Sequence, residues 1–126
     1  MKVKVYYHHT DCGGVVYYAT YLEFLEEART EFFAERGIDI KELIGKGRFF
    51  VVAHQEVDYR APAAYGDTLE ITTKLKNSSA VRINLEHLVH RGDRTVVIEA
   101  RTTVAFVDAA FRPRPLPEDI IEKINQ

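Results

Sequence analysis

One long amphipathic helix pattern, followed mainly by strand patterns, most restricts the fold of this 126-residue chain. Large apolar residues recur at spacings of three and four, which places them on one face of a helix. They are Tyr21, Phe24, Leu25, Ala28 and Phe32. We expect a helix from Thr20 to Arg36, ended by Gly37. Thr20 and Glu23 have the spacing of a capping box, so we expect Thr20 to cap the helix.

The rest of the chain alternates as strands do. Four long strand patterns follow the helix, at Phe49–Arg60, Thr68–Lys76, Val81–Val89 and Val96–Phe106. A shorter one, Lys2–His8, precedes it, and short helices are expected at Asp39–Ile44, with Asp39 and Glu42 as a capping box, and at Glu118–Ile124. This order predicts an α+β fold in which a largely antiparallel sheet of about five strands wraps around the helix. Such a sheet leaves an edge exposed, so we expect pairing with a second copy.

Length and composition predict a single domain over residues 1–126, and they argue against nucleic acid and membranes as partners. With 46% hydrophobic and 29% charged residues the chain is globular, and a net charge of −2 gives no reason to expect nucleic-acid binding. The lone Cys12 favours a reducing compartment. No apolar run has signal-peptide or transmembrane character, so we expect a cytoplasmic protein without membrane insertion.

The loop before the long helix carries the best candidate for chemistry. Asp11 stands at its mouth, followed by Gly13 and Gly14. A helix N-terminus offers unpaired N–H groups and a partial positive charge, so a carboxylate facing it suits acyl transfer. Asp11 is therefore a candidate nucleophile or general base, with the glycines allowing close approach of substrate. The alternative is a turn carboxylate beside glycines that serve a tight turn, and the residues alone leave both open.

Competing chemistries have weaker support. His8 and His9, if on a strand, point to opposite faces and rarely bind one metal ion, so no metal is expected. A thiolate beside a carboxylate is electrostatically disfavoured, so we interpret Cys12 as a small loop residue. Five tyrosines surround the loop; most are interpreted as core or interface packing, with one or two as candidates to line an acyl pocket. They are Tyr6, Tyr7, Tyr17, Tyr18 and Tyr21. The polar face of the first long strand, with His54, Glu56, Asp58 and Arg60, is interpreted as a solvated face or a subunit contact.

Several motifs together resemble a known family. They are Tyr6-Tyr7-x-x-Thr10-Asp11-x-Gly13-Gly14-Val15-Val16-Tyr17-x-x-x-Tyr21, Glu27-Ala28-Arg29-Thr30-Glu31, Asp58-Tyr59-x-Ala61-Pro62-Ala63 and Pro113-Arg114-x-Leu116-Pro117. The chain is similar over nearly its whole length to the bacterial acyl-CoA thioesterases associated with the Tol–Pal gene cluster. These belong to the 4-hydroxybenzoyl-CoA thioesterase-like group of hotdog-fold proteins.

The resemblance implies a hotdog fold, a homodimer or homotetramer with one continuous sheet per dimer, and an active site between subunits. It places the catalytic carboxylate on Asp11 and the N–H that polarises the thioester carbonyl on Tyr18, where many relatives carry histidine. The backbone of Gly14 and Val15 is expected to meet the substrate, and Lys76 is assigned to the CoA phosphates by its position alone, with a solvated strand end as the alternative.

Three functions follow as hypotheses. The first is hydrolysis of a small or medium acyl-CoA without a cofactor, by direct attack of Asp11 or by activation of water. The second is a non-catalytic module that binds acyl-CoA or acyl carrier protein. The third, dehydratase chemistry, needs an active-site histidine for which the chain offers no clear candidate.

Overall fold

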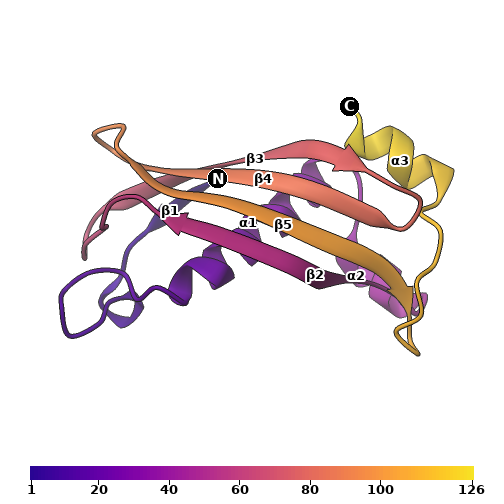
Figure 1. Cartoon of the computed structure of the whole chain (residues 1–126), viewed down its shortest axis with the longest axis horizontal. Helices are drawn as coiled ribbons and strands as arrows, with labels where there is room; N and C mark the ends of the chain where they lie inside the picture. Colours follow the sequence, from indigo (N-terminus) through magenta and orange to yellow (C-terminus); the bar gives the residue numbers. More distant parts are fainter.

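A five-stranded antiparallel sheet curls around one long helix in the computed structural model, which describes residues 1–126 (Figure 1). The elements are β1 (Lys2–Lys4), a 3-10 turn (Tyr7–His9), α1 (Thr20–Glu35), α2 (Ile40–Gly45), β2 (Arg48–Tyr59), β3 (Thr68–Ser78), β4 (Arg82–Arg91), β5 (Val96–Asp108) and α3 (Glu118–Ile124). The strand order is β1-β3-β4-β5-β2, so β1 and β2 form the edges. The predicted α+β architecture is confirmed.

α1 begins and ends where its sequence predicts, but it is capped differently at its start. Its N-cap residue is Ala19, which is already helical in its backbone, and no side chain caps the helix. The Thr20 N–H donates to Tyr17 O (2.9 Å), so a turn leads into the helix and Thr20 is its first residue. The predicted Thr20–Glu23 capping box is therefore wrong. The end follows prediction: Gly37, at φ +76°, donates to Ala34 O.

The first strand is shorter than predicted. Only Lys2–Lys4 pair with β3, and Tyr7–His9 form a 3-10 turn instead of continuing the strand. Local bonds explain the difference, because the Tyr6 N–H donates to His9 Nδ1 (2.9 Å) and Thr10 Oγ1 donates to Tyr7 O (2.6 Å). Such side-chain-to-backbone bonds compete with a sheet ladder. At α2 the predicted cap is confirmed: Asp39 accepts from the N–H groups of Lys41 and Glu42.

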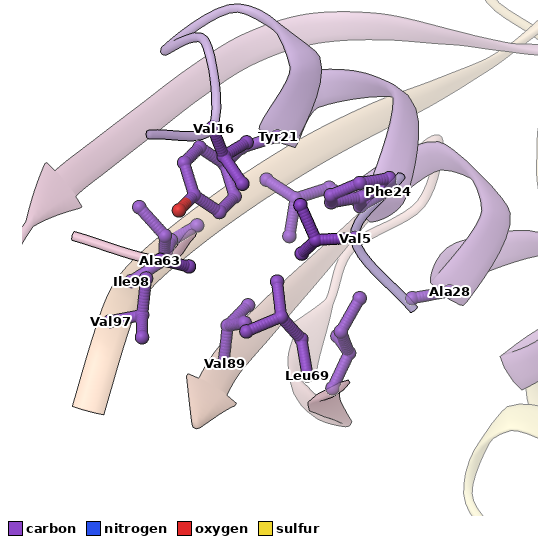
Figure 2. Close-up of a cluster of buried hydrophobic side chains, with 13 residues drawn as sticks. Val5, Val16, Tyr21, Phe24, Ala28, Ala63, Leu69, Val89, Val97 and Ile98 are labelled. Atoms are coloured by element: carbon purple, nitrogen blue, oxygen red, sulfur yellow. The ribbon is translucent and has the colours of Figure 1, made fainter. Parts of the chain in front are cut away.

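The core beneath α1 divides into two apolar clusters. One lies under the N-terminal half of the helix and includes Tyr21, Phe24 and Leu25, and Figure 2 shows Val16 and Tyr21 packed over Ala63 and the strands. The other lies under the C-terminal half and contains the large side chains Phe32, Phe33, Ile83, Leu85, Val104 and Phe106. The loop before α1 therefore packs, through Val16, on the first of these clusters.

Polar side chains lie on the inner face of the sheet between these clusters. His87 on β4 is 3% exposed, and its Nδ1 is 3.0 Å from Thr73 Oγ1 on β3. Thr102 on β5 is 1% exposed and donates to Gln55 Oε1 on β2 (2.8 Å). His87 Nε2 has no partner in the chain. Burial and the neighbouring Arg29 cation lower the pKa of His87 to about 4.

This buried imidazole predicts acid sensitivity. Its pKa is about 4 in the folded chain against 6.5 when unfolded, so the unfolded state binds the proton first. The stability is fully present above pH 6.5 and is lost as pH falls toward 4, by about 3 kcal/mol in total. Urea melts at pH 7 and pH 4 should show wild type losing about that much more than His87→Gln, which cannot titrate. Equal losses in the two proteins would contradict the prediction.

The outer face of the sheet carries exposed ion pairs. Arg101 bonds Glu56 (2.6 Å) and Asp58 (3.0 Å), and Arg60 bonds Glu99 (3.0 Å). These half-exposed charges fit the interpretation of this strand face as a solvated surface or a subunit contact. No helix combines the length and apolar character needed to cross a membrane.

Candidate active site

The loop from Thr10 to Val16 is tied at both ends. Isolated antiparallel bridges join Thr10 to Val16 and Val15 to Ala64. The Val16 N–H donates to Ala63 O (2.8 Å), and the Tyr17 N–H donates to His9 O (2.9 Å). The loop is therefore fixed on one side to the segment after β2 and on the other to the 3-10 turn.

Asp11 serves the turn and still presents a free oxygen. Its Oδ1 accepts from the Gly13 N–H (2.8 Å), and its carbonyl accepts from the Gly14 N–H (3.0 Å). A Cβ at Gly13 would lie 3.1 Å from Oδ1, and Gly14 adopts φ +79°, so both positions suit glycine. No hydrogen bond of the chain uses Oδ2 of this exposed side chain. Asp11 is thus a turn carboxylate through Oδ1, as the alternative interpretation expects, while Oδ2 stays available to a substrate or a water molecule.

The start of α1 leaves backbone donors free. The N–H groups of Tyr18 and Ala19 have no acceptor in the chain, because the first bonds of this region begin at Thr20 and Leu22. The Tyr59 hydroxyl donates to Tyr18 O (2.9 Å), which fixes the orientation of the residue. Nothing within the chain competes for these two donors, which lie just before the first residue of α1.

A cavity of about 420 Å³ joins these groups. It is lined by Asp11, Val15, Val16, Tyr18, Tyr21, Tyr59, Arg60, Ala61 and Pro62. The structure thus brings Asp11, Val15 and Tyr18 together as predicted. Gly14 shapes the loop without lining the cavity, and Lys76 lies near the end of β3 away from the loop, outside the cavity of its own chain.

The far wall of the cavity was not predicted as part of the site. Tyr59 ends β2, and Arg60, Ala61 and Pro62 follow it directly, about forty residues after the helix begins. The motif around Ala61-Pro62 was the only sequence signal. Tyr21, one of the tyrosines near the loop, does line the cavity; burial raises its pKa to about 12 and also raises that of Tyr59. Both phenols are therefore neutral at physiological pH.

The histidines beside the loop have structural contacts. His8 and His9 stand in the 3-10 turn with ring centroids 4.0 Å apart, not on opposite faces of a strand. His9 accepts from the Tyr6 N–H and packs edge-on against Phe24 at 4.9 Å. Burial lowers its pKa. No three His, Cys, Asp or Glu side chains of the chain are grouped closely enough to bind a metal ion.

A curled five-stranded antiparallel sheet wrapped around one long helix is the hotdog fold. The family model of the Thioesterase-like superfamily matches residues 5–124, and the chain belongs to this superfamily. It shares 36% identity over 125 residues with "Acyl-CoA thioester hydrolase YbgC" of Escherichia coli strain CFT073, covering 98% of this chain and 93% of that protein.

Solved structures agree with the hotdog fold. The chain matches the protein TT1821 of Thermus thermophilus, described as hypothetical, with a TM-score of 0.93 at 30% identity, over 99% of this chain and 95% of that one. A 1,4-dihydroxy-2-naphthoyl-CoA thioesterase from Synechocystis gives a TM-score of 0.93 at 23% identity, over 100% and 94% of the two chains. The latter likeness shows the fold alone. The hotdog fold and the thioesterase family expected from the sequence are confirmed.

Proposed function

We propose that this chain hydrolyses the thioester of a small or medium acyl-CoA, releasing the free acid and CoA, at the cavity between Asp11 and Tyr18. The observation that carries the proposal is the pairing of one free carboxylate oxygen with free helix-end N–H groups at a single apolar cavity. The E. coli relative is named for acyl-CoA thioester hydrolysis. A cavity of about 420 Å³ suits a small or medium acyl group.

The chemistry needs an attacking oxygen and a site for negative charge. In one route Asp11 attacks the carbonyl carbon, CoA leaves as the thiolate, and water then cleaves the mixed anhydride. In the other route Asp11 takes a proton from the water that attacks. In both, the Tyr18 N–H donates to the oxyanion, and one such donor contributes about 3–4 kcal/mol in comparable enzymes. A backbone donor works with tyrosine at this position as well as with the histidine of many relatives.

A thiol-release assay over a panel of acyl-CoA and acyl carrier protein thioesters tests the activity. We expect release of CoA from small and medium acyl groups, with rates that fall for long chains because the cavity is small. Tight binding of the thioesters without any release of thiol would instead identify a non-catalytic acyl-binding module.

We further propose that the working form is a homodimer or homotetramer joined at β2. This edge strand pairs only with β5, and Val52 on it is 50% exposed. An unprotected edge pairs readily with another chain. In such a dimer we expect Lys76 to meet the phosphates of a CoA bound at the partner's site, since it lies away from the cavity of its own chain.

Light scattering should therefore give a mass of at least two 14.5-kDa chains at micromolar concentration. A charge in the middle of the edge opposes pairing, so we expect Val52→Lys to shift the protein toward monomer. Ile44→Lys, at an equally exposed apolar residue on α2, is the matched control and should leave the mass unchanged. A wild-type monomer with full activity would refute the proposal.

A further inference from the structure

Two free backbone N–H groups at the start of α1 belong to peptide planes that are held through their carbonyl oxygens. A trans peptide is planar, with its C=O and its N–H pointing in opposite directions, so a bond to the oxygen also fixes the direction of the N–H. The peptide that carries the Tyr18 N–H is held by the bond from the Thr20 N–H to Tyr17 O (2.9 Å). The peptide that carries the Ala19 N–H is held by the bond from the Tyr59 hydroxyl to Tyr18 O (2.9 Å).

The second of these planes depends on the Tyr59 hydroxyl alone. Tyr18 O accepts from no backbone N–H, because the Leu22 N–H, which would reach it in a regular helix, donates to Ala19 O instead (3.1 Å). Without the phenol, the peptide between Tyr18 and Ala19 would have no hydrogen bond on either side. A side chain at the end of β2 therefore fixes a peptide at the start of α1, although the two residues are 41 positions apart in the sequence.

The two free N–H groups point to the same side. Ala19 has φ −76° and ψ −20°, close to the third position of a type I turn, in which the preceding residue is helical as well. Successive N–H groups of helical residues are nearly parallel and point toward the N-terminal end of the helix. Asp11 lies at that end, where it lines one cavity with Tyr18 and Tyr59. A carbonyl oxygen in front of the Tyr18 N–H therefore also faces the Ala19 N–H.

The ring of Tyr59 is held independently of its hydroxyl. It makes edge-on contacts with Tyr18 and with Tyr21, at 6.4 Å and 6.0 Å between ring centroids. Burial raises the pKa of the phenol, so at physiological pH the hydroxyl keeps the proton that it donates. A phenylalanine at this position would keep both ring contacts and lose only the hydrogen bond to Tyr18 O. The hydroxyl can therefore be removed while the packing around the cavity is retained.

We propose that Tyr59 is a positioning residue for an oxyanion hole with two donors, the Tyr18 N–H and the Ala19 N–H, the second of which is aimed by the Tyr59 hydroxyl. The inference rests on the proposed hydrolysis at Asp11 and adds a residue whose hydroxyl bonds the backbone and not the substrate. As negative charge develops on the thioester oxygen, both N–H groups donate to it. The phenol also strengthens the second donor, because a hydrogen bond to a peptide oxygen polarises the N–H of the same peptide.

Tyr59→Phe separates this role from packing. We expect kcat for thiol release to fall about 10- to 100-fold, up to the loss caused by misplacing a catalytic group by about 1 Å. KM should change less than about twofold, because the hydroxyl makes no contact with the substrate. Tyr65→Phe is the matched control and should keep the wild-type kcat. Tyr65 is 63% exposed, lies outside the cavity, and has no hydrogen bond through its hydroxyl within the chain.

Two thioethers of CoA test the donors without turnover. The acetonyl thioether carries a ketone oxygen, and the propyl thioether is its counterpart without that oxygen. By titration calorimetry we expect the wild type to bind the acetonyl compound more tightly than the propyl compound. Tyr59→Phe should weaken the acetonyl compound about 2- to 10-fold, the net worth of a neutral hydrogen bond, and leave the propyl compound unchanged.

The possible results separate the positioning role from the hydrolysis itself. If the wild type cleaves thioesters and Tyr59→Phe keeps more than about half of its kcat, the positioning role is wrong and the hydrolase stands. If Tyr59→Phe weakens both thioethers equally, the hydroxyl serves the shape of the cavity, and the proposal fails. If no thioester is cleaved, the thioethers decide alone: a loss confined to the acetonyl compound supports the two donors, and equal affinities in the two proteins overturn them.

Discussion

Asp11→Asn should abolish thioester hydrolysis while leaving the fold intact. The amide keeps an oxygen that accepts from the Gly13 N–H, so the turn bond observed at 2.8 Å survives. What is lost is the anionic oxygen that attacks the carbonyl or takes the proton from water. Loss of a general base costs about 10²- to 10⁴-fold in rate, and loss of a covalent nucleophile costs more. Steady-state thiol release measured beside a thermal melt checks both halves of the prediction.

Asp39→Asn is the matched control for this substitution. Asp39 caps α2 through bonds to two backbone N–H groups and lies outside the cavity. Its variant should retain wild-type turnover. If Asp11 served only the turn, Asp11→Asn would behave like this control and keep more than about a tenth of wild-type kcat, a loss too small for removal of a general base.

Phe24→Ala should cause the largest loss of stability among single changes near the site. Phe24 is 2% exposed and supports the loop through an edge-on contact with His9 at 4.9 Å. Truncating a buried phenylalanine costs about 3–5 kcal/mol, a large part of the 5–15 kcal/mol typical of a domain. Because the His9 carbonyl holds the Tyr17 N–H, activity should fall as well.

Denaturant melts of Phe24→Ala and Phe111→Ala compare the same substitution at a buried and at an exposed position. Phe111 is 73% exposed, so its truncation should change the free energy of unfolding by less than about 0.5 kcal/mol. Similar melts for the two variants would show that the cluster beneath the loop does not carry the stability assigned to it.

The helix and the long strands were predictable because each buries one face, which spaces its apolar residues at the period of a helix or a strand. α1 occupies Thr20–Glu35 against a prediction of Thr20–Arg36, and the four long strands agree within a few residues at each end. α3 matches its predicted range, Glu118–Ile124. The apolar faces of these strands must pack against the one long helix, which leaves few other arrangements of the segments.

The errors fall where local hydrogen bonds override the pattern. Tyr7 continues the alternation of Lys2–His8, but the bond from the Tyr6 N–H to His9 Nδ1 closes a turn there. Thr20 has the right neighbours for a cap but stands one position too late. The Tyr6–His9 bond and the turn bond from the Thr20 N–H to Tyr17 O are both local, and neither changes the hydrophobic periodicity of the sequence.

Half of the candidate site was predictable for a related reason. Asp11, Val15 and Tyr18 are close in sequence, so local reasoning brings them together. The opposite wall, with Tyr59 and Pro62, depends on how the sheet folds back on α1. Residues that are brought together only by the folding of the sheet are far apart in the sequence, so no spacing pattern predicts their contact.

A structure with a non-hydrolysable acyl-CoA analogue tests the central claim most directly. The account predicts that the carbonyl oxygen of the analogue lies about 3 Å from the backbone nitrogen of Tyr18, the distance of an N–H to oxygen hydrogen bond, with a carboxylate oxygen of Asp11 facing the carbonyl carbon or its attacking water. An analogue bound with its carbonyl away from both groups, for example on the outer face of the sheet, would contradict it.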